Sequence, residues 1–262
     1  MIVDVSSLPG VVARLRAAGC VFAEDEAALL VREAGTPGAL EALVARRVAG
    51  EPLEQVLGWA WFRGLRIAVE PGVFVPRLRT GFLVERAAAL LRPGAVVVDL
   101  CCGSGAVGAA LAAVAPVRLY AADLDPAAVR CARRNLGAER VFRGDLYAAL
   151  PAGLAGRVDV VVANAPYVPT SAIATMPPEA RDHEPPAALD GGADGLDVQR
   201  RVIAGAPRWL APGGSLLVET GERQAPATRA AFERAGRAAA VARSAEVDGT
   251  VVAGVLTGDV TP

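Results

Sequence analysis

The chain has 262 residues, of which 53% are hydrophobic and 21% are charged, and its formal net charge is −1. A chain of this length can bury a substantial core and form one large domain with a smaller one beside it. A near-neutral chain is a poor general binder of polyanions, which argues against sequence-independent nucleic-acid binding.

The first 57 residues are predicted to form a small helical domain. Apolar residues recur at three-and-four spacing in 8–18, 25–34 and 37–49, which predicts three helices. Glycines follow each pattern where C-terminal caps belong, and Pro37 suits the first turn of the third helix. No catalytic motif lies in this unit, so we expect it to dock the substrate or to cover the site.

Residues 58–71 are predicted to form a β-hairpin that links two domains. Trp61 and Phe62 precede a turn at Gly64, and apolar and polar side chains then alternate over 65–70. Alternation with a period of two on both sides of a glycine turn is typical of a hairpin.

Helical and strand patterns alternate through the predicted second domain, 72–262. Strands are predicted at 95–100, 118–122, 140–143, 158–163, 215–219, 239–243 and 251–256, and helices at 80–91, 106–115, 126–136, 198–210 and 225–235. This order predicts an α/β fold with a Rossmann-like, doubly wound, mostly parallel seven-stranded sheet, whose ligands bind at the carboxyl ends of the strands. The segment 168–197 is rich in Pro and Gly and is expected to be a long loop beside that site.

A glycine-rich turn follows the first strand of this predicted sheet. Gly103, Gly105 and Gly108 satisfy the G-x-G-x-x-G pattern, and Asp123 ends the next strand about 20 residues later. A dinucleotide and S-adenosylmethionine both fit, because both need close backbone approach and a carboxylate for the ribose hydroxyls. Asp99 precedes the glycines, where it would repel a pyrophosphate and attract the ammonium of S-adenosylmethionine. The pattern therefore favours the methyl donor.

Asp145 and Leu146 follow the short strand predicted at 140–143. A carboxylate there can meet the amino edge of an adenine ring. A glycine turn with a purely structural role is the alternative to either ligand.

The strand predicted at 158–163 ends in Asn164, Ala165, Pro166 and Tyr167. If the Asn164 side-chain oxygen and the Ala165 carbonyl each accept one N–H, a planar amide nitrogen is held towards a sulfonium methyl. Two fixed dipoles then stabilise the positive charge that grows on the nitrogen. Pro166 would stiffen the loop and Tyr167 would pack on the amide plane. The other interpretation is an ordinary strand-ending turn.

These motifs resemble the HemK/PrmC group of protein-glutamine N-methyltransferases, which modify the Gly-Gly-Gln loop of peptide-chain release factors. The loop of that group reads Asn-Pro-Pro-Tyr, and Ala165 replaces its first Pro. Cys101 replaces the first motif glycine, and Arg79 and Gly81 stand where the group has acidic residues. The resemblance also covers the helical N-terminal unit and segments at 50–53, 74–80, 184–185 and 194–196.

The resemblance implies a class I methyltransferase fold, S-adenosylmethionine as cofactor and a release-factor glutamine as substrate. It implies that catalysis depends on Asn164, Ala165, Pro166 and Tyr167. The cofactor-binding residues that it implies are Pro76, Arg77, Thr80, Asp99, Cys101, Gly103, Gly105, Asp123, Leu124, Asp145, Leu146 and Asn164. No metal site is expected.

The four cysteines, Cys20, Cys101, Cys102 and Cys131, lack zinc spacing and lie in apolar segments. We expect them to be small buried side chains in a reducing compartment. No apolar run is long enough to span a membrane, and residues 1–6 lack the parts of a secretory signal. The expectation is a cytoplasmic protein with no membrane partner and no stable nucleic-acid partner.

Two other kinds of function stay open from the sequence. The same loop could hold a small-molecule amine or an adenine amine, although adenine in a duplex would require base flipping and a basic groove. A cofactor-binding module without turnover is the remaining alternative, since Cys101 and Ala165 depart from the pattern of the group.

Overall fold

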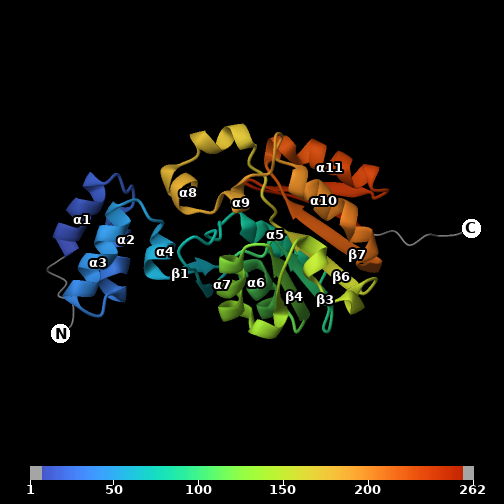
Figure 1. Ribbon diagram of the computed structural model, residues 1–262, viewed down its shortest axis with the longest axis horizontal. Helices are drawn as coiled ribbons and strands as arrows, with labels where there is room; N and C mark the ends of the chain where they lie inside the picture. The colour runs from blue at the N-terminus through green and yellow to red at the C-terminus, as the bar shows by residue number, and fades with distance from the viewer. Residues whose placement is uncertain (1–7, 256–262) are drawn as a thin grey trace, which may run out of the picture.

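Three helices pack together at the N-terminal end of the molecule (Figure 1). The computed structural model describes residues 8–255, beginning with α1 (Leu8–Ala17), α2 (Ala23–Glu33) and α3 (Pro37–Val48). The three predicted helices are confirmed, and their shared core includes Leu15, Leu30 and Val44, which are fully buried. The short helix α4 (Leu53–Leu57) follows. Sequence patterning missed it because five residues are too few to show a helical period.

A buried ion pair joins α2 to α3. The Arg47 Nε lies 2.6 Å from Glu26 Oε2, and the two side chains are only 7% and 10% exposed. Arg47 also donates to the Glu51 carbonyl at 3.0 Å and lies 2.7 Å from Glu179 Oε1 on α8 (Pro178–His183). One guanidinium therefore connects the N-terminal helices to the segment 168–197, which follows the loop at 164–167.

The predicted hairpin forms between β1 (Trp59–Phe62) and β2 (Leu65–Ala68), which pair antiparallel. Asn135 on α7 (Pro126–Leu136) closes it onto the larger sheet. Its Oδ1 accepts from the Ala68 N–H at 2.9 Å and its Nδ2 donates to the Ala68 carbonyl at 3.0 Å. The same Nδ2 donates to the Ser104 carbonyl at 2.8 Å, so one amide braces both the hairpin and the glycine turn.

A seven-stranded sheet forms the centre of the fold, in the order β5-β4-β3-β6-β7-β9-β8. The first five strands are parallel, and β9 runs antiparallel between β7 and β8. The strands are β3 (Val96–Leu100), β4 (Arg118–Asp123), β5 (Val141–Arg143), β6 (Val158–Ala163), β7 (Leu210–Glu219), β8 (Ala239–Ser244) and β9 (Gly249–Val255). The predicted doubly wound sheet is confirmed, and position 256 of the last predicted strand lies outside the described residues.

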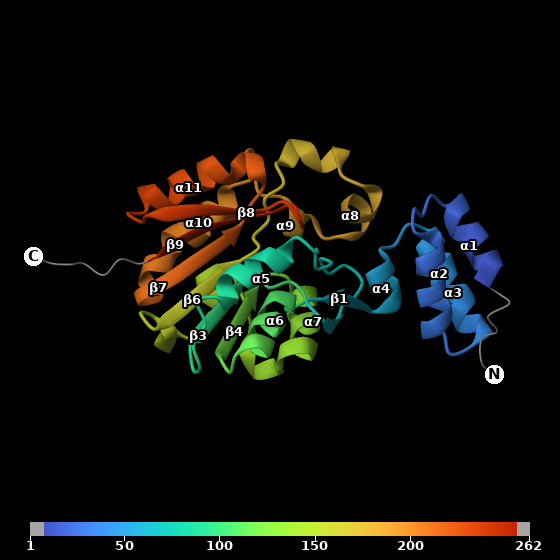
Figure 2. The same cartoon turned by 180° about the vertical axis from the view of Figure 1, so that it is seen from behind.

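Helices cover both faces of this sheet (Figure 2). On one face lie α5 (Thr80–Ala88), α6 (Ala106–Val114) and α7, and on the other lie α10 (Asp197–Gly205) and α11 (Ala225–Arg234). The helix predicted at 198–210 ends early, at Gly205, because Pro207 follows and cannot continue an α-helical ladder. None of the helices within residues 8–255 is long and apolar enough to cross a membrane.

The segment 168–197 is not the continuous loop that was expected. It contains a 3₁₀ turn at Thr170–Thr175, then α8 and α9 (Pro186–Leu189). Each piece is too short to show periodicity in the sequence. The segment is bound to the end of the loop at 164–167, because the Val168 N–H donates to the Leu189 carbonyl and the Val168 carbonyl accepts from the Gly191 N–H, both at 2.9 Å.

Replacing Glu26 with Ala should lower the free energy of unfolding by about 3 kcal/mol, because it leaves the buried Arg47 guanidinium without its nearest partner. Urea titration followed by circular dichroism measures the loss. Glu41→Ala is the matched control, since it removes the exposed partner of Arg14 and should cost less than about 1 kcal/mol. Equal losses in the two variants would show that burial does not set the strength of the Arg47 pair.

Candidate functional site

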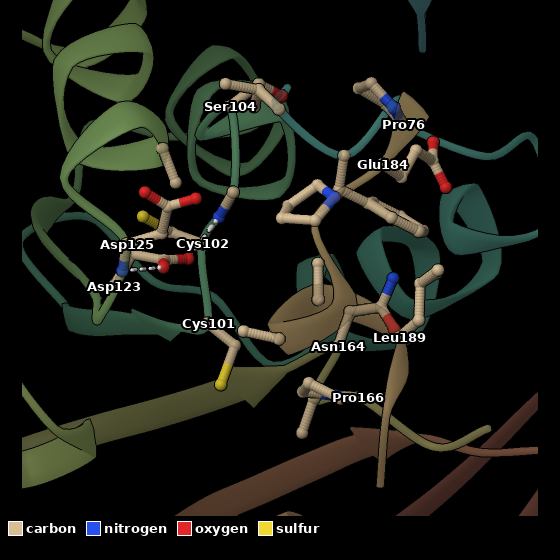
Figure 3. A pocket seen from close by; sticks show the side chains of 18 of the residues that line it. Pro76, Cys101, Cys102, Ser104, Asp123, Asp125, Asn164, Pro166, Glu184 and Leu189 are labelled. Atoms are coloured by element: carbon tan, nitrogen blue, oxygen red, sulfur yellow. Dashed lines mark hydrogen bonds between the residues drawn. The ribbon is translucent and has the colours of Figure 1, made fainter. Parts of the chain in front are cut away.

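A cavity of about 480 Å³ lies at the carboxyl ends of β3, β4 and β6 (Figure 3). Its walls come from the glycine turn, the segment before α5, the loop after β6 and the segment 168–197. This is where a doubly wound sheet changes its winding direction, and cofactors bind at such points. All of the site residues predicted from the sequence line the cavity, with the exception of Gly105.

Gly105 does not line the cavity, and its predicted role in cofactor binding stays a prediction. Its φ is +80°, and a Cβ there would lie 2.8 Å from the Leu136 Cδ1. The close packing of α7 behind the turn is therefore a structural reason for a glycine at this position.

Cys101 occupies a left-handed backbone conformation, with φ of +55°. Such a conformation costs a residue with a side chain about 1–2 kcal/mol relative to glycine. Burial and the nearby acids, Asp123 first among them, raise the pKa of its thiol, so the sulfur stays protonated. The side chain lines the cavity as a small neutral group, without the reactivity of a thiolate.

The Asp123 carboxylate is fixed by two backbone N–H groups. Its Oδ2 accepts from Gly103 at 2.8 Å and its Oδ1 from Asp125 at 2.9 Å. Burial raises its pKa, although these hydrogen bonds act in the opposite direction. A carboxylate offers about four lone-pair positions, so this group can still accept from hydroxyls in the cavity.

Asp99 is buried, with 2% of its surface exposed, and its Oδ2 accepts from the Gly108 N–H on α6 at 2.9 Å. Burial raises the pKa of this carboxyl to about 7, and the charge of Asp123 adds to the effect. A cation in the cavity would lower the pKa again, because it stabilises the charged form. The site therefore favours a ligand that carries a positive group.

Asp145 lies at the rim of the cavity and pairs with Arg201 on α10. Both side chains are about half exposed. The ion pair engages Asp145 Oδ2, which leaves Oδ1 for the adenine edge that was predicted to bind there. Leu124 and Leu146 supply apolar surface to the same part of the cavity.

The Asn164 carboxamide has a defined orientation. Its Nδ2 donates to the Thr80 Oγ1 at 3.2 Å, across the gap between β6 and the start of α5. With the nitrogen end engaged by Thr80, the oxygen end is the one left to accept a hydrogen bond from a ligand. The predicted hydrogen bond from a substrate amide N–H to the Asn164 oxygen requires this orientation of the carboxamide.

The backbone of the loop at 164–167 is held in place by the segment 168–197 and by Gln224. A Cβ at Gly191 would lie 2.7 Å from the Pro166 carbonyl oxygen, and one at Gly195 would lie 2.3 Å from the Tyr167 carbonyl oxygen. Gln224 donates to that Tyr167 carbonyl at 2.8 Å. Two close glycines and one amide therefore set the position of the loop, including the buried Ala165.

Two buried acids, one in the cavity lining and one behind it, contact site residues and were given no role from the sequence. The Glu184 Oε1 accepts from the Val75 N–H at 3.0 Å, and its Oε2 accepts from Arg77 at 2.6 Å. Glu184 thus clamps the segment 168–197 over the cavity wall, and Arg77 is engaged in that clamp. Glu219, at the end of β7, accepts from the Tyr167 hydroxyl at 3.3 Å. Glu219 could have been identified from the sequence, because it is an acid at the end of a strand, as Asp123 is.

Within the described part of the chain, no group of three or more His, Cys, Asp or Glu side chains could hold a metal ion. The four cysteines are free. Cys102 and Cys131 are buried as expected, whereas Cys20 and Cys101 are partly exposed.

Comparison with known proteins gives the family. Residues 65–177 match the methyltransferase small domain family. The chain is 41% identical to a release factor glutamine methyltransferase of Geobacter sulfurreducens, over 76% of this chain and 70% of that protein. It is 42% identical to a 4-amino-L-phenylalanine/4-methylamino-L-phenylalanine methyltransferase of Streptomyces pristinaespiralis, over 74% of this chain and 69% of that protein.

A crystal structure of a methyltransferase from Pyrococcus furiosus has the same fold, with a TM-score of 0.56 at 18% identity, over 82% of this chain and 98% of that one. The predicted class I methyltransferase fold is therefore confirmed. The sequence identity and coverage go further and show that the chain belongs to the release factor glutamine methyltransferase family.

Proposed function

We propose that this chain is an S-adenosylmethionine-dependent N-methyltransferase that modifies a glutamine side chain in a peptide-chain release factor. The observation that carries the proposal is the Asn164 carboxamide, which Thr80 holds with its oxygen free to accept from a substrate amide. The names of its relatives support the same substrate. We also infer that the protein acts in the cytoplasm, where release factors work.

The cavity fits the proposed cofactor, which supplies a methyl group on a positively charged sulfur. Asp99 can receive the ammonium of its methionine part, and Asp123 can accept from the ribose hydroxyls. Asp145 offers its remaining oxygen to the adenine edge. Three acids along one wall suit a cationic ligand and would repel the pyrophosphate of a dinucleotide.

The catalytic residues act by holding the substrate amide. An amide nitrogen is a poor nucleophile because its lone pair is delocalised into the carbonyl group. When the Asn164 Oδ1 and the Ala165 carbonyl each accept one N–H, they orient the nitrogen and stabilise the positive charge that it gains in the transition state. No general base is required, since the nitrogen proton becomes acidic as the new bond forms.

An aromatic amine is the second candidate substrate. The relative named for 4-amino-L-phenylalanine is as similar to this chain as the release-factor relatives are. The same pair of oxygens would hold an aniline NH₂ group in the same way. Arg79, which stands where the HemK/PrmC group has an acid, also lines the cavity and could face the carboxylate of a free amino acid.

One assay separates these functions. The protein is incubated with isotopically labelled S-adenosylmethionine and either purified release factors or 4-amino-L-phenylalanine, and the products are analysed by mass spectrometry. Label on the glutamine of the Gly-Gly-Gln peptide supports the proposal. Label only on the amino acid favours the second candidate. Cofactor binding by calorimetry with neither product would indicate a module without turnover.

Asn164→Ala should lower kcat by about 10²–10³-fold, because it removes a preorganised dipole that acts mainly in the transition state. The dissociation constant for S-adenosylmethionine should stay close to that of the wild type. Ala165→Pro is the control, since that position acts through its backbone carbonyl, and its effect should be much smaller. Near-normal turnover in Asn164→Ala would show that residues 164–167 are an ordinary strand-ending turn without a role in catalysis.

Affinity for S-adenosylmethionine should fall as the pH drops below about 7. The pKa of Asp99 is about 7 in the free protein, so acid neutralises the carboxyl that meets the ammonium. Calorimetry should give binding roughly five- to tenfold weaker at pH 6 than at pH 7.5. Asp99→Asn should bind weakly at both values, with no such dependence. Equal wild-type affinity at both pH values would exclude this contact.

We also propose that residues 8–57 dock the protein substrate. Val21 and Phe22 are 84% and 68% exposed in the loop between α1 and α2. Arg47 pairs with Glu26 on α2 and with Glu179 on α8, so the helical unit that carries this loop is joined to α8, which contributes to the cavity wall.

Changing Val21 and Phe22 together to Ser should raise KM for an intact release factor several-fold and leave kcat nearly unchanged. The physical reason is the loss of apolar contact area that takes no part in the chemistry. A short Gly-Gly-Gln peptide serves as the control substrate, because it is too small to reach the loop. An unchanged KM for the intact protein would remove the docking role.

A further inference from the structure

Gln224 lies in a short 3₁₀ turn between β7 and α11, and its side-chain amide binds two separate parts of the chain. Its Nε2 donates to the Tyr167 carbonyl at 2.8 Å and to the Asp194 carbonyl at 2.9 Å. These residues are 57 and 30 positions away in the sequence. A carbonyl oxygen can only accept, and an amide nitrogen has two protons to donate, so the nitrogen end of the side chain has to face both carbonyls.

Glycines make room at both ends of this amide. A Cβ at Gly195 would lie 2.3 Å from the Gln224 Nε2, and one at Gly221 would lie 2.7 Å from the Gln224 Oε1. Gly195 also has a φ of +78°, which a residue with a side chain rarely adopts. The surrounding backbone is therefore shaped to accept one carboxamide at this place.

The backbone that carries Gln224 is fixed by buried neighbours. Ala225, the next residue, is fully buried in the core. The buried Gln199 on α10 donates to the Glu219 carbonyl at 3.0 Å and accepts from the Thr228 hydroxyl at 2.9 Å. Because the end of β7 and the start of α11 are held in this way, the Gln224 amide is a fixed point to which the loop at 164–167 is bound.

The bound Tyr167 carbonyl is close in the chain to the group that is proposed to hold the substrate. The Ala165 carbonyl, one of the two proposed acceptors, lies two residues before it. Pro166 stands between them with a fixed φ, so few free rotations separate the two carbonyls. A displacement of about 1 Å at a reacting group can slow a reaction by about 10²-fold, so the position of this backbone matters for the rate.

We propose that Gln224 is a positioning residue for the methyl transfer. Its NH₂ group binds the Tyr167 and Asp194 carbonyls together, and it thereby fixes residues 164–167 relative to the segment 168–197. The inference rests on the proposed function and deepens it, because Gln224 does not line the cavity and still controls how the substrate amide is held.

The proposal makes the side-chain nitrogen of Gln224 essential. Glutamate has the same shape, but it would place a charged oxygen against two carbonyl oxygens and repel them. Methionine fills a similar space and has no proton to donate. If Gln224 only filled space, both Gln224→Glu and Gln224→Met would leave the loop where it is.

The first test observes the Tyr167 carbonyl directly and needs no substrate. Tyr167 and Val168 form the one Tyr-Val pair in the sequence, so labelling with ¹³C-carbonyl tyrosine and ¹⁵N-valine gives a single cross-peak in a carbonyl-edited NMR spectrum. In Gln224→Met the carbon signal should move upfield, as expected when a carbonyl loses a hydrogen bond. Arg223→Met changes an exposed neighbour and should leave the signal unchanged. An unchanged signal in Gln224→Met would overturn the proposal.

The second test measures turnover on whichever substrate the wild type methylates, at saturating cofactor and at a temperature where circular dichroism shows every variant folded. Gln224→Met should lower kcat about 10–100-fold, and Gln224→Glu should lower it at least as much. The dissociation constant for S-adenosylmethionine should stay within about threefold of the wild type, because Gln224 does not line the cavity. Arg223→Met should turn over like the wild type.

Wild-type kcat in Gln224→Glu would show that the shape of the side chain is sufficient, and this would contradict the positioning role. Losses of equal size in kcat and in cofactor affinity would contradict it as well, since they would indicate a general change in the fold. If the wild type methylates none of the substrates, the proposed function fails, and the Tyr167 signal still decides whether Gln224 holds the loop. The two failures are therefore distinguishable.

Discussion

The hydrogen bond from the Asn164 Nδ2 to the Thr80 Oγ1 is the contact on which the rest of the site depends. A carboxamide donates at one end and accepts at the other, so the same side chain can attract or repel an incoming N–H. Fixing the nitrogen on Thr80 makes the cavity-facing end an acceptor. The fold brings the two residues together because α5 begins beside the carboxyl end of β6. Without the hydrogen bond to Thr80, the Asn164 carboxamide would have no fixed orientation and could not be expected to present its oxygen to a substrate.

The remainder of the cavity is arranged around this contact. The Glu184 clamp closes one wall, and the close approach of Gly191 and Gly195 sets the loop backbone. Acids on the opposite wall, Asp99 and Asp123, are held by backbone N–H groups, which keeps charged groups in a buried place. Raised pKa values at Asp99 and Glu219 show the cost of that burial. Charge is concentrated where a cationic cofactor and a developing positive nitrogen would meet it.

Much of this could be predicted from the sequence, because the informative features are local. The strand before Gly103 and the loop at Asn164 are each formed by consecutive residues, so each can be recognised in the sequence. Because the strands are parallel, their carboxyl ends lie at one edge of the sheet and the two motifs come together. What could not be predicted depends on distant partners: the Glu184 bond to Arg77, 107 residues away, and the Tyr167 bond to Glu219, 52 residues away. The close packing of α7 behind Gly105 could not be predicted for the same reason, because it depends on the distant Leu136.

A crystal structure of the protein with S-adenosylhomocysteine and a Gly-Gly-Gln peptide would show whether Asn164 and Ala165 bind the substrate amide. We expect the glutamine Nε2 to lie at hydrogen-bond distance, about 2.7–3.2 Å, from both the Asn164 Oδ1 and the Ala165 carbonyl oxygen. The Asn164 Nδ2 should still be bound to Thr80. A glutamine side chain outside the cavity, or an Asn164 carboxamide that turns its nitrogen to the peptide, would contradict it.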